Sequence, residues 1–204
     1  MKGPEHEDAW DAYLIPGTDV LVNKLGITTN AGLRSAENDL VEVRIAELRS
    51  SPIIIRQTFD GRHLKALHRW LFQDVYHWAG EFRTVGIAKA GESFVPPLNI
   101  EQPLQHVATR IAELDQLRSI ENEDMPEVVA YLYDYLNYAH PFREGNGRTQ
   151  REFFDQLLAR SGRGLDWERI DMEDLHNACH SARAFDDLGP LVEIVSNILI
   201  ERPG

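Results

Sequence analysis

One segment of the chain, residues 140–151 with the sequence HPFREGNGRTQR, brings together an imidazole, a carboxylate, a glycine-rich turn and two arginines. His140 is the only side chain in it whose ordinary pKa lies near neutrality, so it is the candidate general base. Gly145, Asn146 and Gly147 tolerate a positive φ, so consecutive backbone N–H groups can turn to one side and surround an anion. The chemistry that this pattern favours is the binding and transfer of a phosphate group.

The remaining charged residues of the segment suit a phosphate with a metal ion. Arg148 and Arg151 are three residues apart, so on a helix both guanidinium groups can reach the same phosphate. Glu144 would repel a bare phosphate, but it fits a hard cation such as Mg²⁺, which prefers few protein carboxylates together with phosphate oxygens. An Asn-Gly pair alone is most often a plain turn, and two arginines alone are a solvated helix face. The combination indicates a site.

Two helices must position this segment. The apolar run over residues 128–136 predicts a helix that ends near His140, because Pro141 restricts the residue before it. Apolar residues recur at helical spacing over 153–158, so a second helix should begin at the glycine turn. The N-terminus of that helix adds partial positive charge where an anion would bind.

The segment resembles the signature of Fic proteins, His-Pro-Phe-x-Asp/Glu-Gly-Asn-Gly-Arg-x-x-Arg, and matches it at every defined position. Residues 71–83 (LFQDVYHWAGEFR) are similar to the Fic segment that precedes its hairpin flap, and residues 11–21 are similar to the opening of such chains. The resemblance implies an all-α, mainly helical Fic fold with a small β-hairpin. It also implies protein adenylylation, in which a hydroxyl of a target protein attacks the α-phosphate of ATP.

The resemblance assigns roles residue by residue. His140 would take the proton of the hydroxyl, Glu144 would hold Mg²⁺ on the α- and β-phosphates, and Phe142 would anchor the loop in the core. The residues implied to hold the phosphates are Gly145, Asn146, Gly147, Arg148 and, at the γ-phosphate, Arg151.

Residues 82–97 predict a short hairpin around the turn Ala-Gly-Glu-Ser at 90–93. An ordinary surface hairpin would give the same pattern. Its likeness to the Fic flap favours a strand edge that captures a target segment by backbone pairing. The residues expected to dock the target are Val85, Gly86, Ile87, Ala88, Lys89 and Ala90.

A partner is expected as well. Many Fic proteins carry, or are bound by, a helix with Ser/Thr-x-x-x-Glu-Gly/Asn whose glutamate pairs with the second motif arginine, here Arg151. Residues 119–124 (SIENED) come nearest to this pattern, but they end in the wrong residue and lie in a predicted connection. We therefore expect a small antitoxin to supply the glutamate. Resemblance to compact bacterial Fic toxins also implies type II topoisomerase subunits as targets.

Composition sets wider limits. With 204 residues and 43% hydrophobic content, the chain can form one core, so a single domain over 1–204 is predicted. The formal net charge of −12 argues against direct binding to nucleic acid or an anionic membrane. Cys179 is the only cysteine, and neither a signal sequence nor an 18-residue apolar run is present, which favours a cytoplasmic protein.

Apolar periodicity predicts further helices over 33–49, 60–78, 98–117, 171–180 and 191–200, and a turn at 15–19 predicts a helix start near Thr18 or Asp19. The histidines at 63, 68 and 77 are interpreted as structural or surface residues. His176, Cys179 and His180 share a helix face, but their spacing only weakly indicates a metal site.

Other functions are compatible with the same motif. The site could transfer another phosphate-containing group or remove AMP, or the chain could be a non-catalytic nucleotide-binding scaffold. The intact Gly-Asn-Gly-Arg turn beginning at Gly145 favours attack on the α-phosphate, and the presence of His140 argues against an idle scaffold.

Overall fold

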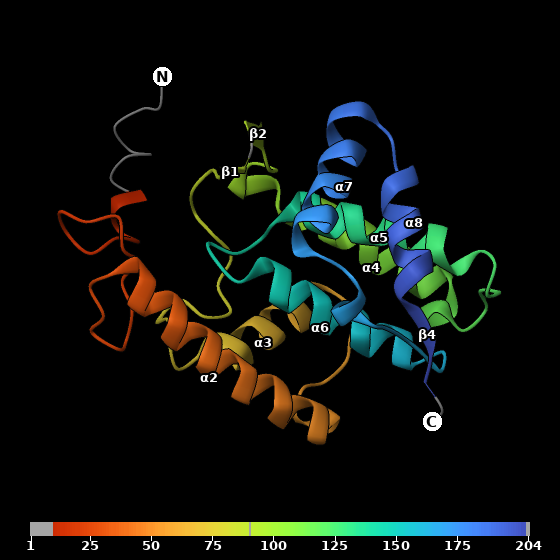
Figure 1. The fold of residues 1–204 in the computed structure, drawn as a ribbon, viewed down its shortest axis with the longest axis horizontal. Coiled ribbons are helices and arrows are strands. Elements are labelled where there is room, and N and C mark those ends of the chain that lie inside the picture. The colour runs from red at the N-terminus through yellow and green to blue at the C-terminus, as the bar shows by residue number, and fades with distance from the viewer. Residues whose placement is uncertain (1–9, 90, 203–204) are drawn as a thin grey trace.

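The computed structural model describes residues 10–89 and 91–202 and is mainly α-helical (Figure 1), which confirms the predicted fold class. Its longer helices are α2 (Asn30–Ser50), α3 (Gly61–Phe72), α4 (Glu101–Glu113), α5 (Met125–Ala139), α6 (Asn146–Ala159), α7 (Met172–Phe185) and α8 (Gly189–Ile198). Short 3₁₀ helices lie at η1 (Pro52–Ile54), η2 (Pro97–Asn99), η3 (Asp115–Leu117) and η4 (Trp167–Arg169). The strands are β1 (Ala88–Lys89), β2 (Glu92–Ser93), β3 (Arg163–Leu165) and β4 (Leu199–Glu201).

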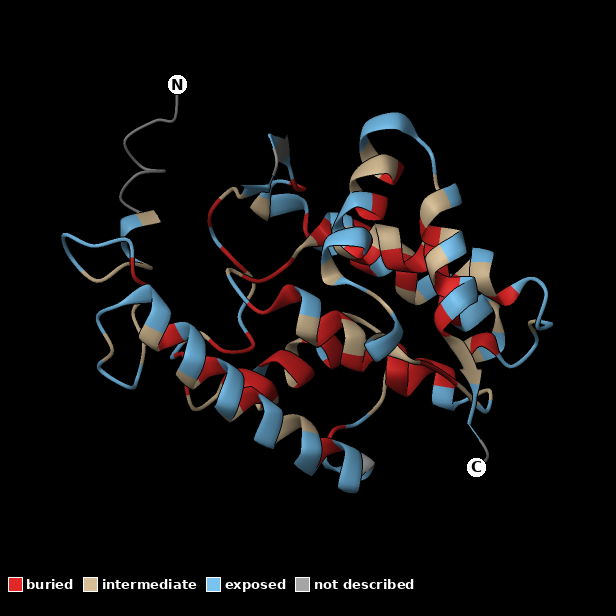
Figure 2. Ribbon diagram, in the orientation of Figure 1, coloured by how far each residue is buried: buried red, intermediate tan, exposed pale blue. Residues whose placement is uncertain are grey.

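Helix α6 runs through the centre of the fold and is buried along most of its length (Figure 2). Its buried polar side chains bond to neighbouring helices. Gln150 donates to the carbonyl oxygen of Tyr133 in α5 at 2.7 Å, and Gln156 lies 2.9 Å from Nε2 of His63 in α3. A buried polar group without a partner costs roughly 1–3 kcal/mol, so these bonds fix the rotation of α6 about its axis.

Helix α2 lies along one side of the fold and packs on α3 (Figure 1). It begins where the hydroxyl of Thr29 accepts the backbone N–H of Gly32, a side-chain cap of the kind that stabilises helix starts. Leu33 and Val41 face inward at helical spacing. Between them stands Glu37, a carboxylate that is only 5% exposed and therefore requires a partner.

Helix α5 packs against α4, α7 and α8, and it carries the chain to the motif. Pro126 stands in its first turn, where a missing N–H has no cost. The helix ends at Ala139, and His140 follows in the left-handed region with φ 37° and ψ 59°. The predicted helix end near His140 is therefore confirmed. Among the described residues, no helix has the length and apolar character needed to cross a bilayer.

The predicted hairpin is present as β1 and β2, which project from the helical body (Figure 1). Ala88 pairs with Ser93, and the N–H of Phe94 donates to the carbonyl oxygen of Ile87 at 3.1 Å. Ala90, at the turn, lies outside the described residues. A second antiparallel pair, β3 with β4, joins the end of the chain to the segment after α6.

The expected helix after Thr18 is wrong. The segment forms a turn in which the Thr18 hydroxyl donates to the carbonyl oxygen of Ile15 at 2.8 Å, and Leu14 and Leu21 form an antiparallel bridge. Such side-chain bonds to the backbone compete with helix formation. Among the described residues, the first long helix begins only after Thr29, which supplies its cap.

Three predicted helices end earlier in the structure than expected, whereas the one expected over 171–180 continues to Phe185. The helix expected over 60–78 ends at Phe72, and the apolar residues after it are buried from a turn. The helix expected over 98–117 stops at Glu113, before a run of positive φ over 115–117. The terminal helix expected to reach Ile200 changes to strand at Leu199, because β3 offers a pairing edge that local periodicity cannot reveal.

Candidate active site

A cavity of about 970 Å³ lies between the 140–151 segment, the hairpin and helix α7. Its wall includes Lys89 from β1 and His176, His180 and Arg183 from α7. The motif residues on the wall are His140, Arg143, Glu144, Gly145, Asn146, Gly147, Arg148, Gln150 and Arg151. Two carboxylates, Glu144 and Glu173, also line the cavity, but the arginines and Lys89 outnumber them. The wall therefore favours an anionic ligand, although the formal net charge of the chain is −12.

His140 stands at the C-terminus of α5 with its ring stacked on Phe94, the two ring centres 3.8 Å apart. Its Nδ1 lies 3.2 Å from the carbonyl oxygen of Asn137, which can only accept. Nδ1 therefore carries the hydrogen, and Nε2 keeps a free lone pair. Burial, reinforced by the nearby positive charges of Arg83 and Arg183, lowers the pKa of His140 to about 3. The imidazole is neutral at pH 7, as a general base must be.

Gly145 starts α6 with φ +81°, a conformation that side chains rarely adopt. A Cβ at this position would lie 2.3 Å from the ring of Phe72, so no other residue fits. The glycine lets the backbone pass directly over this ring and present the N-terminus of α6 to the cavity. This is the geometry of an anion-binding turn.

Asn146 closes the loop from inside. Its side-chain oxygen accepts the N–H of Phe142 and its amide donates to the carbonyl oxygen of the same residue, both at 2.8 Å. Phe142 is 1% exposed and stacks on His68 with ring centres 3.9 Å apart. The side chain of Asn146 is thereby committed to holding the loop, so its contribution to an anion would come from the backbone.

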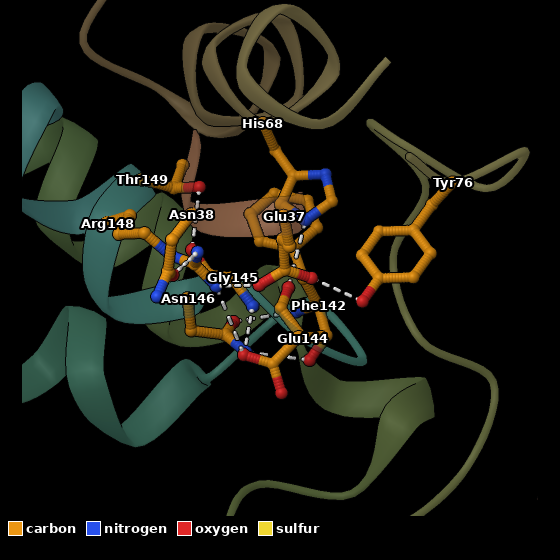
Figure 3. A network of polar contacts seen from close by, with 10 residues as sticks. All are labelled: Glu37, Asn38, His68, Tyr76, Phe142, Glu144, Gly145, Asn146, Arg148 and Thr149. Atoms are coloured by element: carbon orange, nitrogen blue, oxygen red, sulfur yellow. Dashed lines mark hydrogen bonds and ion pairs between the residues drawn. The ribbon is translucent and has the colours of Figure 1, made fainter. Parts of the chain in front are cut away.

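Arg148 is held by α2 (Figure 3). One terminal nitrogen bonds to a carboxylate oxygen of Glu37, and the other lies 3.2 Å from the side-chain oxygen of Asn38. The hydroxyl of Tyr76 donates to the second oxygen of Glu37. Burial raises the pKa of this phenol, and the hydrogen bond to Glu37 raises it further. The guanidinium also lies over the ring of Phe72. Arg148 is therefore fixed in place before any ligand binds.

Arg151, unlike Arg148, has a neutral neighbour at its guanidinium. Its guanidinium lies 3.4 Å from the sulfur of Met172 and lines the cavity, and burial lowers its pKa. Within residues 10–89 and 91–202, no carboxylate forms an ion pair with it. A partly buried cation with a neutral neighbour favours an incoming anion.

Glu144 stands at the edge of the cavity with its side chain 47% exposed. Its Oε1 accepts the N–H of Gly145 at 2.8 Å and lies 3.6 Å from the guanidinium of Arg148. The carboxylate is thus beside the start of α6 and accessible from the cavity. A metal ion there would meet both this carboxylate and any bound phosphate.

Arg83 joins the hairpin to the helix end that carries His140. It is 2% exposed, and its guanidinium donates to the carbonyl oxygens of His140 and Val85 at 2.8 Å each and to that of Val95 at 2.5 Å. A longer contact of 3.3 Å reaches the carbonyl oxygen of Ala139. Burial lowers the pKa of Arg83 to about 10, and the carbonyl dipoles stabilise the charge that remains.

Sequence reasoning missed the residues that support the motif from outside it. Glu37 and Asn38 form the dipeptide Glu-Asn in which the inhibitory pattern ends, but Leu33 stands where that pattern has Ser or Thr, and the bonded arginine is Arg148. His68 is structural, one of the two interpretations drawn from the sequence, but its place against the motif loop, where the ring is fully buried, is not visible in the sequence. Arg83 carried no local signal, because all its carbonyl partners except that of Val85 come from segments farther along the chain.

The other predicted residues divide between cavity and surroundings. Val85 is buried below the hairpin, whereas Gly86 and Ile87 are half-buried and Ala88 is exposed. His176, Cys179 and His180 all line the cavity from α7, and burial raises the pKa of the Cys179 thiol to about 12. A protonated thiol is a poor metal ligand.

These features define a helical protein with a pocket suited to an anionic ligand at the start of α6, and comparison with known proteins identifies the family. Residues 58–158 match the model of the Fic/DOC family, and the chain belongs to that family. It is 33% identical over 94% of its length to the probable protein adenylyltransferase Fic of Escherichia coli K12, of which it covers 93%. It is 36% identical over 85% of its length to protein adenylyltransferase VbhT of Bartonella schoenbuchensis, but it spans only 36% of that protein.

Solved structures agree with the fold. The structure of BepC from Bartonella tribocorum with bound AMPPNP matches 95% of this chain and 98% of its own with a TM-score of 0.89 at 25% identity. The Fic domain of an effector from Bartonella sp. AR 15-3 matches 93% of this chain and 91% of its own with a TM-score of 0.87 at 29% identity.

The carbonyl cage around Arg83 leads to a stability prediction. Arg83→Lys should lower the free energy of unfolding by about 2–4 kcal/mol, because one ammonium cannot reach carbonyl oxygens spread over the whole guanidinium fork. Chemical denaturation measures the change. Arg69→Lys is the matched control, since that side chain is 66% exposed and, among the residues that the structure describes, pairs with Glu81 alone; a change under about 0.5 kcal/mol is expected there. Equal effects of the two substitutions would contradict the role of Arg83.

Proposed function

We propose that this chain is a protein adenylyltransferase that transfers AMP from ATP to a hydroxyl side chain of a target protein. The observation that carries the proposal is the neutral imidazole of His140, with Nε2 free, on the wall of a cationic cavity that also contains the start of α6. Family membership and the names of the relatives support the same activity.

In the proposed reaction, Nε2 of His140 takes the proton of the target hydroxyl as its oxygen attacks the α-phosphorus of ATP. A phosphorus–oxygen bond to the target forms, and the bond between the α-phosphorus and the oxygen bridging to the β-phosphate breaks. Pyrophosphate leaves with the electron pair. The depressed pKa of His140 keeps the acceptor nitrogen unprotonated across the neutral range.

The phosphates would be bound by the turn that starts α6. Backbone N–H groups of Gly145, Asn146 and Gly147 point from a helix N-terminus, where the helix dipole favours negative charge. Arg148 of α6, held in place by Glu37 of α2, would bind the phosphates, and Arg151, which has a neutral neighbour, would meet the γ-phosphate. Charge developing on the leaving pyrophosphate would be neutralised mainly by these groups.

Glu144 fits the expected Mg²⁺ ion. Its half-exposed carboxylate stands beside the phosphate-binding turn, and among the described residues no group of three or more His, Cys, Asp or Glu side chains could hold a metal by itself. A single carboxylate that shares the ion with phosphate oxygens is the arrangement Mg²⁺ prefers. When bound, the ion supplies positive charge at the α- and β-phosphates.

The hairpin would dock the target by strand pairing. Next to the β1–β2 pair, the carbonyl oxygen of Ile87 accepts the N–H of Phe94 and therefore faces the strand that carries Phe94. The neighbouring Ala88 is the non-bonded partner of Ser93, so its N–H and C=O point to the free edge of β1. That edge, on the strand whose Lys89 lines the cavity, is where a target segment would pair.

Targets and restraint follow from the same proposal. The chain would act as the toxin of a toxin–antitoxin pair in the cytoplasm, as a single Fic domain over 1–204, with type II topoisomerase subunits as the first targets to test. A glutamate from a small antitoxin would pair with Arg151 and displace the γ-phosphate. Glu37 does not pair with Arg151 in place of that glutamate, because it is bound to Arg148.

The first prediction concerns the general base. His140→Ala should reduce labelling of target protein from α-labelled ATP by about 10²–10⁴-fold while ATP binding persists, because only the proton acceptor is lost. Labelling of a cell lysate and calorimetric ATP binding measure the two quantities. His77→Ala, at an exposed histidine outside the cavity, is the control. Retention of more than about a tenth of the labelling would exclude His140 as the base.

The second prediction concerns the hairpin. Ala88→Pro should block labelling of the target but leave ATP binding intact, because proline removes an N–H from the free edge of β1. Ser93→Pro is the matched control, because its N–H points to the opposite edge of the pair. If both variants label the target as the native chain does, docking by strand pairing at β1 is wrong.

The third prediction concerns restraint. A peptide that carries the Ser/Thr-x-x-x-Glu-Gly/Asn pattern on a helix should inhibit labelling by the isolated chain, because its carboxylate competes with the γ-phosphate for Arg151. The same peptide with Gln in place of Glu should inhibit much less. Absence of labelling by the chain without any peptide would contradict the model and indicate restraint from within.

A further inference from the structure

His68 lies at the centre of an aromatic cluster beneath the motif loop. It is fully buried on α3, and its ring stacks between those of Phe142, Phe72 and Trp78, with centre distances of 3.9, 4.7 and 5.9 Å. The ring is therefore held in one orientation. A histidine in such a setting could be a simple core filler, so its hydrogen bonds decide what it does.

Two hydrogen bonds fix the tautomer of His68. Its Nδ1 accepts the backbone N–H of Gly80 at 2.8 Å and so carries no hydrogen. Its Nε2 therefore carries the hydrogen and donates it to the carbonyl oxygen of Glu144 at 3.0 Å (Figure 3).

The carbonyl oxygen that His68 holds belongs to the peptide between Glu144 and Gly145. In a trans peptide the C=O and the N–H point in opposite directions. With the oxygen bonded toward α3, the N–H of Gly145 points away from α3, where it lies 2.8 Å from the carboxylate oxygen Oε1 of Glu144 at the cavity. This N–H is the first of the series at the start of α6.

Glycine alone would not keep the peptide in this orientation. Gly145 lacks a Cβ, so the backbone around it can adopt conformations closed to other residues, including ones in which this peptide is turned over. A turned peptide would place a carbonyl oxygen, which repels phosphate, where an N–H is needed. The contact with Phe72 explains why the residue must be glycine, and the bond from His68 supplies the constraint that glycine lacks.

We propose that His68 is a positioning residue for nucleotide binding: its Nε2–H holds the Glu144–Gly145 peptide so that the N–H of Gly145 faces the phosphate site. This inference rests on the proposed function, in which the start of α6 binds the phosphates of ATP. It adds that a residue of α3, more than seventy positions before the motif, sets the direction of the first donor.

His63 offers a matched comparison on the same helix. It is also buried, and its Nε2 lies 2.9 Å from the side-chain oxygen of Gln156. Its ring packs against Phe59 and Phe153. His63→Phe thus removes a buried imidazole and one hydrogen bond from α3 without altering the motif loop, which makes it a control for general loss of stability.

The experiment compares ATP and adenosine binding by calorimetry, with thermal unfolding, for His68→Phe, His68→Gln and His63→Phe. His68→Phe should weaken ATP binding about tenfold or more relative to His63→Phe, since a hydrogen bond that orients a donor to a charged group is lost. Adenosine, which has no phosphate, should bind equally to all the variants. His68→Gln should recover most of the ATP affinity, because its amide can donate to the same carbonyl oxygen.

Each other outcome overturns the inference. ATP binding by folded His68→Phe within about threefold of His63→Phe, or equal losses for ATP and adenosine, would make His68 a core residue only. A His68→Gln variant as weak as His68→Phe would do the same. Arg151→Ala separates this inference from the proposed function. If the Arg151→Ala variant binds ATP normally, the proposed phosphate site is wrong. If Arg151→Ala loses ATP binding but His68→Phe keeps it, only the role of His68 is rejected.

Discussion

The positive charge of Arg83 inside the protein is the interaction on which the active-site geometry depends. A buried guanidinium requires acceptors on every side, and here they are carbonyl oxygens from the hairpin base and from the end of α5. The same residue therefore constrains the hairpin and His140 at once. Its backbone N–H, which donates to the carbonyl oxygen of Pro141 at 2.8 Å, extends the constraint into the motif.

The motif loop is held from below as well as from its ends. Phe142 and His68 stack in the core, and the side chain of Asn146 bonds both backbone groups of Phe142. Left-handed backbone at His140 and Gly145 is tolerated because these contacts over-determine the path between them. The result is a rigid turn, so the free energy of ligand binding is not spent on ordering the loop.

The two motif arginines differ in a way that matters for an acidic protein. Arg148 is neutralised by Glu37 and serves as a fixed donor, whereas Arg151 is paired with no carboxylate in the part of the chain that the structure describes. The attraction for an anion is therefore concentrated at Arg151, the start of α6, Lys89, and Arg183 of α7. Local charges overcome the unfavourable net charge because screening weakens distant ones over about 10 Å.

The sequence by itself determined the helices with strong apolar periodicity, the end of α5 before Pro141, the hairpin and the identity of the motif residues, because each depends on neighbours close in the chain. Only the tertiary structure decided how the motif is supported. Glu37, His68 and Arg83 reach it from segments that folding brings together, and the pairing of β3 with β4 replaced the end of a predicted helix for the same reason. A local sequence pattern predicts periodic elements and turns, but it does not indicate which residues distant in sequence will be in contact.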